Sequence, residues 1–138
     1  MKIFIAGLTG TGKSSVAQAI ANEFNITYYA SSKLAKELLG VDWKSTNRTA
    51  SEGNYIDKRV NSNDDELIDN YLLDLVKKED NFVIDSWTLP WLFKDKGIRI
   101  LLSASFDTRV NRVIGRDNKN IAAITNIVIE KDKESRTV

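Results

Sequence analysis

Residues 2–15 read KIFIAGLTGTGKSS: an apolar run, then three glycines within six residues, then a lysine and two serines. The uninterrupted apolar run Ile3–Ala6 is typical of a short strand buried on both faces. Val16, Ile20 and Phe24 follow at intervals of four, which predicts one face of an amphipathic helix that begins near Gly12. The segment therefore predicts a strand, a glycine-rich loop and a helix, in that order.

The loop Gly7–Ser14 fits the P-loop pattern of glycine, four residues, glycine, lysine, and serine or threonine. Glycines allow successive backbone amides to close around phosphate oxygens, and the helix that follows adds its free N-terminal amides. Lys13 can then reach the β- and γ-phosphates, while the hydroxyl of Ser14 is suited to bind Mg²⁺. We expect ATP to bind one continuous set of residues: Gly7, Leu8, Thr9, Gly10, Thr11, Gly12, Lys13, Ser14 and Ser15.

Composition excludes several kinds of chemistry. The 138 residues, 42% of them hydrophobic, fit one domain with a real core. The chain contains no His and no Cys, which excludes a Ser-His-Asp or Cys-His pair, a CxxC redox pair and the usual zinc ligands. A net charge of +1 gives no general attraction to nucleic acid polymers or to anionic membranes. Because no apolar run approaches the ~18 residues of a membrane span, we expect a cytoplasmic protein, and we expect a monomer.

The rest of the chain alternates between strand and helix patterns, apart from a polar stretch over residues 40–61 without a clear period. Such alternation favours a three-layer α/β sandwich with a mostly parallel sheet covered on both faces. The patterns predict further strands over 26–29, 82–85 and 98–102, and helices over 33–39, 64–79, 107–115 and 121–134.

Asp85 ends the predicted strand 82–85. In an open parallel sheet, ligands bind at the carboxyl ends of the strands, so we expect Asp85 to lie near the glycine loop. The carboxylate is then a candidate for holding Mg²⁺, directly or through water. An alternative role, which does not exclude the first, is the N-cap of a helix over residues 87–93.

Three arginines follow the last predicted strand at spacings of three and four: Arg109, Arg112 and Arg116. These spacings place them on one side of a helix near the mouth of the crevice. Phosphoryl transfer without histidine needs guanidinium groups to offset the charge on the transferring group. The alternative is a solvated basic face that pairs with Asp107 and Asp117.

Taken together, these motifs resemble nucleoside monophosphate kinases, specifically the short cytidylate kinase-like branch typical of archaea, over nearly the whole chain. The resemblance rests on the glycine loop, the arginine spacing that ends in Asp117, the later Glu134-Ser135-Arg136 sequence, and the segment around Asp85 and Trp91. It implies a P-loop NTP hydrolase-like fold and transfer of the γ-phosphoryl of ATP, with Mg²⁺, to a nucleoside monophosphate such as CMP or dCMP.

The family also implies roles for parts of this chain. Residues 31–62 would form the acceptor-binding segment and residues 107–120 the lid. Lys13, Arg112 and Arg116 match the family's phosphate-stabilising positions, and Arg136 matches a basic position after the lid.

The acceptor site departs from the family pattern. Lys33 stands at the Asp of the family's Ser-x-Gly-Asp pattern, and Lys36 stands at an acceptor-phosphate arginine. Lysine holds a phosphate as a point charge and lacks the bidentate fork of arginine. Asp85-Ser86-Trp87 replaces Glu-Gly-Arg after the third strand. We expect the acceptor to contact Lys36, Arg59 and Trp87; the polar-stretch residues Arg48, Lys58 and Arg59 either compensate for the missing arginine or are solvated loop charges.

Two other functions stay open. One is a P-loop phosphotransferase that acts on the hydroxyl of another small acceptor. The other is an ATP-binding regulatory or degenerate protein without efficient turnover. A GTPase switch is disfavoured, because Asn118-Lys119-Asn120-Ile121 lacks the Asp of a guanine-reading motif.

Two further expectations concern packing and length. Tryptophans more often pack in the core or at hinges than stack on a ligand, and this is the expectation for Trp43 and Trp91. Trp87 is the exception, because its position beside Asp85 faces the proposed acceptor site. Family members continue beyond the position of Val138, so we expect a shortened form or a fragment that lacks the last core strand.

Overall fold

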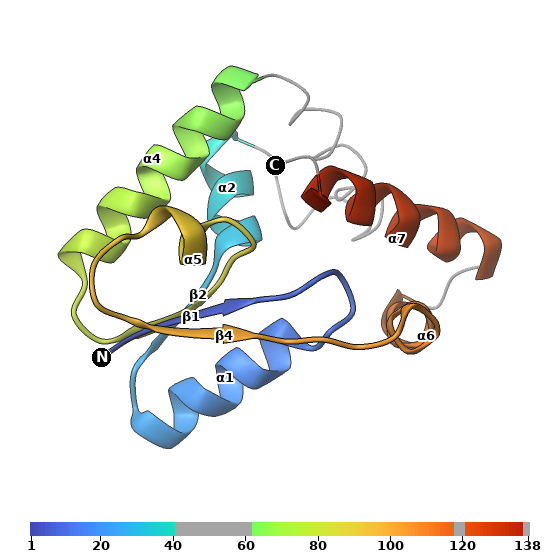
Figure 1. Ribbon diagram of the computed structural model, residues 1–138, viewed down its shortest axis with the longest axis horizontal. Coiled ribbons are helices and arrows are strands. Elements are labelled where there is room, and N and C mark those ends of the chain that lie inside the picture. Colours follow the sequence, from blue (N-terminus) through green and yellow to red (C-terminus); the bar gives the residue numbers. More distant parts are fainter. Residues whose placement is uncertain (41–61, 118–120, 137–138) are drawn as a thin grey trace.

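The computed structural model describes residues 1–40, 62–117 and 121–136, and Figure 1 shows how their helices and strands are arranged. These residues form strands and helices in alternation, as the sequence predicts. The elements are β1 (Lys2–Ala6), α1 (Lys13–Phe24), β2 (Thr27–Ala30), α2 (Ser31–Leu38), α4 (Ser62–Lys78), β3 (Phe82–Asp85), α5 (Leu89–Leu92), β4 (Ile98–Leu101), α6 (Phe106–Asp117) and α7 (Ile121–Arg136).

The four strands form one sheet in the order β2-β3-β1-β4, and every pairing is parallel. Ile5 of β1 lies opposite Asp85 of β3 and Ile100 of β4, so the strands end at the same edge. The chain leaves β1 toward β2 on one side and leaves β3 toward β4 on the other. The end of the β1–β3 pair is therefore a topological switch point, where open α/β sheets bind their ligands.

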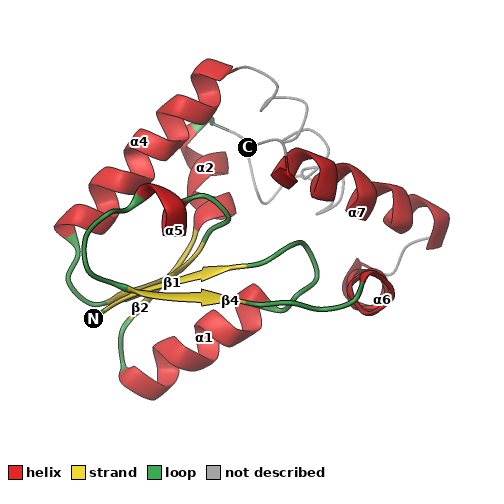
Figure 2. Cartoon of the chain, in the orientation of Figure 1, coloured by secondary structure: helices red, strands yellow, loops and turns green. Residues whose placement is uncertain are grey.

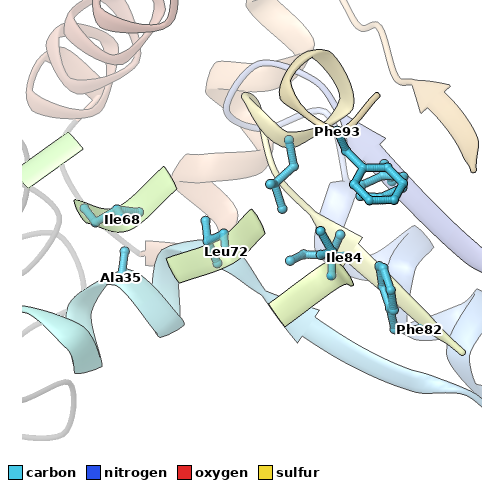
Figure 3. Close-up of a cluster of buried hydrophobic side chains, with 9 residues drawn as sticks. Ala35, Ile68, Leu72, Phe82, Ile84 and Phe93 are labelled. Atoms are coloured by element: carbon cyan, nitrogen blue, oxygen red, sulfur yellow. The ribbon is translucent and has the colours of Figure 1, made fainter. Parts of the chain in front are cut away.

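Side chains alternate along the strands and build a core on each face of the sheet. Phe4, Phe82 and Ile84 point to the face covered by α2, α4 and α5, where they pack with Ala35, Ile68, Leu72 and other buried side chains (Figure 3). Ile3, Ile5 and Val83 point to the opposite face, where α1 covers them with Ala17 and Ala21. Figure 2 shows the resulting three layers, with α1 alone below the strands. The predicted three-layer α/β fold is confirmed.

α6 and α7 form a separate small core beyond the loop ends of the strands (Figure 1). The side chains that they bury against each other are Val110, Val113, Ile124 and Val128. This pair of helices faces the end of the sheet that carries the glycine loop, which is where a lid over that loop is expected.

Two details of the packing differ from what the sequence patterns suggest. Phe24 is 54% exposed, because residues spaced by four drift by about 40° per step around a helix of 3.6 residues per turn. The buried face of α1 instead runs through Ala17 and Ala21. The strand β4 also shows exposed apolar side chains, with Ile98 50% and Leu101 65% exposed. Within the described part of the chain, β4 pairs on one side only and so lies at the edge of the sheet.

Candidate functional site

The glycine loop connects β1 to α1 at the switch point. Gly10 and Gly12 have φ angles of 84° and 92°, in the left-handed region that favours glycine. At Gly7 the constraint is space: a Cβ there would lie 2.5 Å from Oγ1 of Thr11 and 3.0 Å from the carbonyl oxygen of Leu102. Each of the three glycines is thus required by the shape of the loop.

Thr11 closes the loop on itself. Its backbone N–H and its hydroxyl both donate to the carbonyl oxygen of Leu8, at 3.2 and 2.8 Å. α1 then begins with Gly12 at the N-cap position and with no side-chain cap. The amides of its first turn therefore have no capping side chain and can bind an anion.

The ammonium of Lys13 lies inside the loop. Nζ donates to the carbonyl oxygens of Gly7 at 2.7 Å and Leu8 at 3.3 Å. Both acceptors belong to the loop that is expected to surround the phosphates. The charge of Lys13 is therefore held at the cradle rather than in solvent.

Ser14 and Asp85 meet although they lie far apart in the chain. Oγ of Ser14 donates to Oδ2 of Asp85 at 3.4 Å, and the hydroxyl of Tyr28, on β2, donates to the same oxygen. Asp85 is only 6% exposed, so a carboxylate that water solvates poorly is satisfied by two hydroxyl donors. The structure thus brings both predicted metal-binding residues together.

Asp85 is not a helix cap, contrary to the alternative role. The helix after β3 is shorter than the predicted 87–93, and its N-cap residue is Thr88. The amide of Leu89 is bound by Oγ of Ser86 at 3.2 Å. The carboxylate of Asp85 is therefore left to face the glycine loop.

The donor set fits Mg²⁺. Within the described ranges, no group of three or more acidic, His or Cys side chains could hold a metal. A hydroxyl and one carboxylate suit an ion that takes its other ligands from water and from substrate phosphates, as Mg²⁺ does.

The arginines of α6 contact the glycine loop in different ways. Nη1 of Arg112 donates to the carbonyl oxygen of Gly10 at 3.2 Å, and its side chain is exposed. Arg109 is only 4% exposed. Its guanidinium binds Asp132 on α7 through two hydrogen bonds of 2.9 Å and reaches the carbonyl oxygen of Thr9 at 3.3 Å. The alternative prediction of a solvated basic face is therefore wrong for Arg109.

The other predicted residues differ in their location and exposure. Lys36 lies on α2 and is 2% exposed, and Trp87 is half-buried in the loop after β3. Trp91 is 62% exposed, so the prediction that it packs in the core or at a hinge was wrong. Arg116 follows Arg112 by about one turn of α6, but its side chain, like that of Arg136, lies outside the described residues. The segment with Trp43, Arg48, Lys58 and Arg59 lies outside them as well.

Sequence reasoning missed two residues of this site. Tyr28 reads as an ordinary strand residue, yet it binds Asp85. Tyr28 and Tyr29 lie on β2, which pairs with β3, the strand that ends in Asp85. That Tyr28 lies near Asp85 can be predicted only once this strand order is known. Asp132 lies 23 residues after its partner Arg109, and nothing in the local pattern marks it.

Sequence comparisons identify proteins that are similar to this chain. A family model described as an AAA domain matches residues 3–134. The cytidylate kinase of Sulfolobus acidocaldarius is 30% identical, with 99% of this chain and 72% of that protein covered. The cytidylate kinase of Sulfurisphaera tokodaii is also 30% identical, with 96% and 72% covered.

Solved structures match the fold. The shikimate kinase of Bacteroides thetaiotaomicron has a TM-score of 0.68 at 19% identity, with 99% of this chain and 79% of that chain covered. The shikimate kinase of Aquifex aeolicus has a TM-score of 0.61 at 16% identity, with 100% and 83% covered. None of the helices in the described part of the chain has the length and apolar character needed to span a membrane.

Proposed function

This chain belongs to the cytidylate kinase-like nucleoside monophosphate kinases and is an ATP-dependent phosphotransferase, and we propose that its acceptor is CMP or dCMP. The contact between Oγ of Ser14 and Oδ2 of Asp85, 3.4 Å apart beside the glycine loop, supports the ATP and Mg²⁺ part of this function. The relatives' name supports the choice of acceptor.

ATP would bind with its phosphates in the loop Gly7–Ser15. The loop amides and the first turn of α1 would supply hydrogen bonds, and Lys13, whose ammonium contacts the loop at Gly7, would bridge the β- and γ-phosphates. Ser14 and Asp85 would hold Mg²⁺, which when bound neutralises charge on the β- and γ-phosphoryl oxygens. The chain's part in the reaction is alignment and electrostatic stabilisation, because phosphoryl transfer needs little covalent help.

The arginines of α6 would act on the transferring group. Arg112 donates to the carbonyl oxygen of Gly10 in the loop, and its guanidinium is exposed, so we assign it to contact with a bound phosphate. Arg116 follows it by about one helical turn. We assign these two arginines to neutralising charge that develops during transfer, with α6 and α7 forming the lid.

The acceptor would bind against the segment 31–62 and the loop after β3. Lys36, Arg59 and Trp87 are the proposed contacts, with the lysine and arginine for the acceptor phosphate and the tryptophan for the base. Because lysine stands at position 36 and Trp87 stands at the position of the family's Glu-Gly-Arg arginine, we expect weaker phosphate recognition than a bidentate arginine gives.

An assay of ADP formation tests the proposal. The acceptors would be CMP, dCMP, UMP, AMP and dTMP, with cytidine and shikimate as acceptors that lack the phosphate. We expect turnover with CMP or dCMP to exceed that with the others and cytidine to be inactive. Turnover with cytidine or shikimate instead would favour the small-metabolite phosphotransferase, and ATP binding without transfer to any acceptor would favour a regulatory role.

A further inference from the structure

The ion pair between Arg109 and Asp132 is buried and has two parallel hydrogen bonds. Nη1 lies 2.9 Å from Oδ1 and Nη2 lies 2.9 Å from Oδ2, and the two side chains are 5% and 10% exposed. By contrast, the Lys133–Glu130 pair on the same helix α7 is exposed at 69% and 65%. Burying two charges costs free energy of desolvation, which offsets the attraction between them, so burial alone does not show that the pair stabilises the fold. The two-bond geometry fixes the plane of the guanidinium.

The fixed guanidinium also contacts the glycine loop. Nη1 of Arg109 donates to the carbonyl oxygen of Thr9 at 3.3 Å. The backbone of Arg109 packs on the next residue of the loop, since a Cβ at Gly10 would lie 2.7 Å from the Arg109 carbonyl oxygen. One residue of α6 therefore holds two consecutive residues of the loop, by its side chain and by its backbone.

The contact with Thr9 determines the direction of a loop amide. The carbonyl of Thr9 and the N–H of Gly10 belong to one peptide group, which is planar, and the described chain has no cis peptide bond. When the guanidinium holds the carbonyl oxygen on one side, the N–H of Gly10 must point to the other side. This amide belongs to the loop that binds phosphate oxygens.

We propose that Arg109 and Asp132 are positioning residues for nucleotide binding: Asp132 on α7 orients Arg109, and Arg109 fixes the Thr9–Gly10 peptide so that its N–H is directed into the phosphate site. The position of α7 and the affinity for ATP are thereby coupled. The proposal rests on the proposed function insofar as the loop must bind nucleotide. It assigns Arg109 a role other than direct contact with the transferring phosphoryl group.

The first test is the conservative variant Asp132→Asn, with Glu130→Gln as the control that breaks the exposed pair on the same helix. ATP affinity would be measured by calorimetric titration, together with the amide shift of Gly10 by NMR. We expect Asp132→Asn to weaken ATP binding about tenfold, a size typical of coupled positions, to move the Gly10 resonance, and to raise KM for ATP but not for the acceptor. Glu130→Gln should change none of these. A folded Asp132→Asn protein with wild-type ATP affinity overturns the proposal.

The second test separates positioning from stability. The double variant Arg109→Met/Asp132→Leu fills the buried site with apolar side chains, which often restores the stability lost by breaking such a pair. We expect its melting temperature to recover relative to Asp132→Asn while ATP affinity stays weakened, because no guanidinium holds Thr9. Recovery of both would mean that the pair is only structural and would overturn the proposal. If the double variant does not fold, the Asp132→Asn measurements decide.

The results of these two tests can be distinguished from failure of the proposed function. If the unmodified protein does not bind ATP, the proposed function itself fails. If it binds ATP but does not phosphorylate CMP, the coupling between Asp132 and the loop is still tested in full by the titrations.

Discussion

Ser14 and Asp85 are separated by 71 positions in the chain, yet the hydroxyl of one lies 3.4 Å from the carboxylate of the other. The contact exists because β1 and β3 are parallel neighbours that end at the same edge of the sheet. Tyr28, from the strand beyond β3, donates to the same carboxylate oxygen. Side chains from α1 and β2 therefore converge on one carboxylate oxygen of β3 beside the phosphate loop.

Replacing Asp85 by Asn is expected to abolish the effect of Mg²⁺ on ATP binding and to lower kcat about 100-fold or more, as loss of an electrostatic group at the reacting phosphates does. The change keeps the size of the side chain and removes its charge. The measurement is ATP affinity with Mg²⁺ and with EDTA, followed by turnover. Asp95→Asn, in an exposed position, is the control. An unchanged Mg²⁺ effect in Asp85→Asn would rule out this carboxylate as a metal ligand.

Replacing Tyr28 by Phe removes one of the two hydroxyl donors to a buried carboxylate. We expect a loss of about 1–3 kcal/mol in the free energy of unfolding, measured by urea denaturation, and a higher Mg²⁺ concentration for half-maximal activity. Tyr29→Phe is the matched control, since Tyr29 is adjacent but packs on the opposite face of the sheet. Equal effects on Mg²⁺ dependence in the two variants would contradict a role of Tyr28 at Asp85.

Replacing Lys13 by Met keeps a flexible side chain in the loop and removes the ammonium that contacts Gly7 and Leu8. We expect kcat to fall about 100- to 1,000-fold, with far-UV circular dichroism unchanged. Lys96→Met, an exposed position, controls for the loss of one positive charge. Turnover of Lys13→Met within a few-fold of the unmodified protein would mean that the ammonium does not stabilise the transferring phosphoryl group.

A comparison of Gly10→Ala with Gly12→Ala tests the contact between the loop and α6. Both glycines have positive φ angles, so both substitutions carry a similar backbone cost of roughly 1–2 kcal/mol. Only at Gly10 would the new Cβ meet a neighbour, the backbone of Arg109 at 2.7 Å, whereas nothing lies within 4 Å at Gly12. We therefore expect Gly10→Ala to lower the melting temperature more. Equal melting temperatures would show that α6 does not press on the loop in solution.

The layers of the fold were predictable because they follow from local patterns. Apolar runs, glycine loops and helical periods each depend only on residues that are neighbours in the sequence. The positions of the four strands were therefore predicted to within about one residue. The order of the strands, and with it the exposed edge at β4, depends on pairings between distant segments. For this reason Ile98 and Leu101 could not be recognised as exposed from their own sequence.

The candidate site also has a part that local patterns predict and a part that depends on contacts between distant segments. Its loop residues form a motif, and Asp85 was predicted because carboxyl ends of parallel strands share one edge. The partners of these residues were not predictable, since Tyr28 and Asp132 carry no pattern that distinguishes them from other strand and helix residues. The burial of Arg109 was not predictable either. Its spacing predicts a position on the same side of a helix as Arg112, but the ion pair with Asp132 forms because Arg109 is buried against α7.

The central position of β1 in the sheet affects how the chain folds during synthesis. β1 is made before β3 and β4, the two strands with which it pairs among the described residues. Domains rich in such distant pairings fold slowly, because long loops must close before the contacts that reward closure can form. The glycine loop, although it precedes β3 and β4 in the chain, therefore acquires its anchored shape only after residues near 101 have been added.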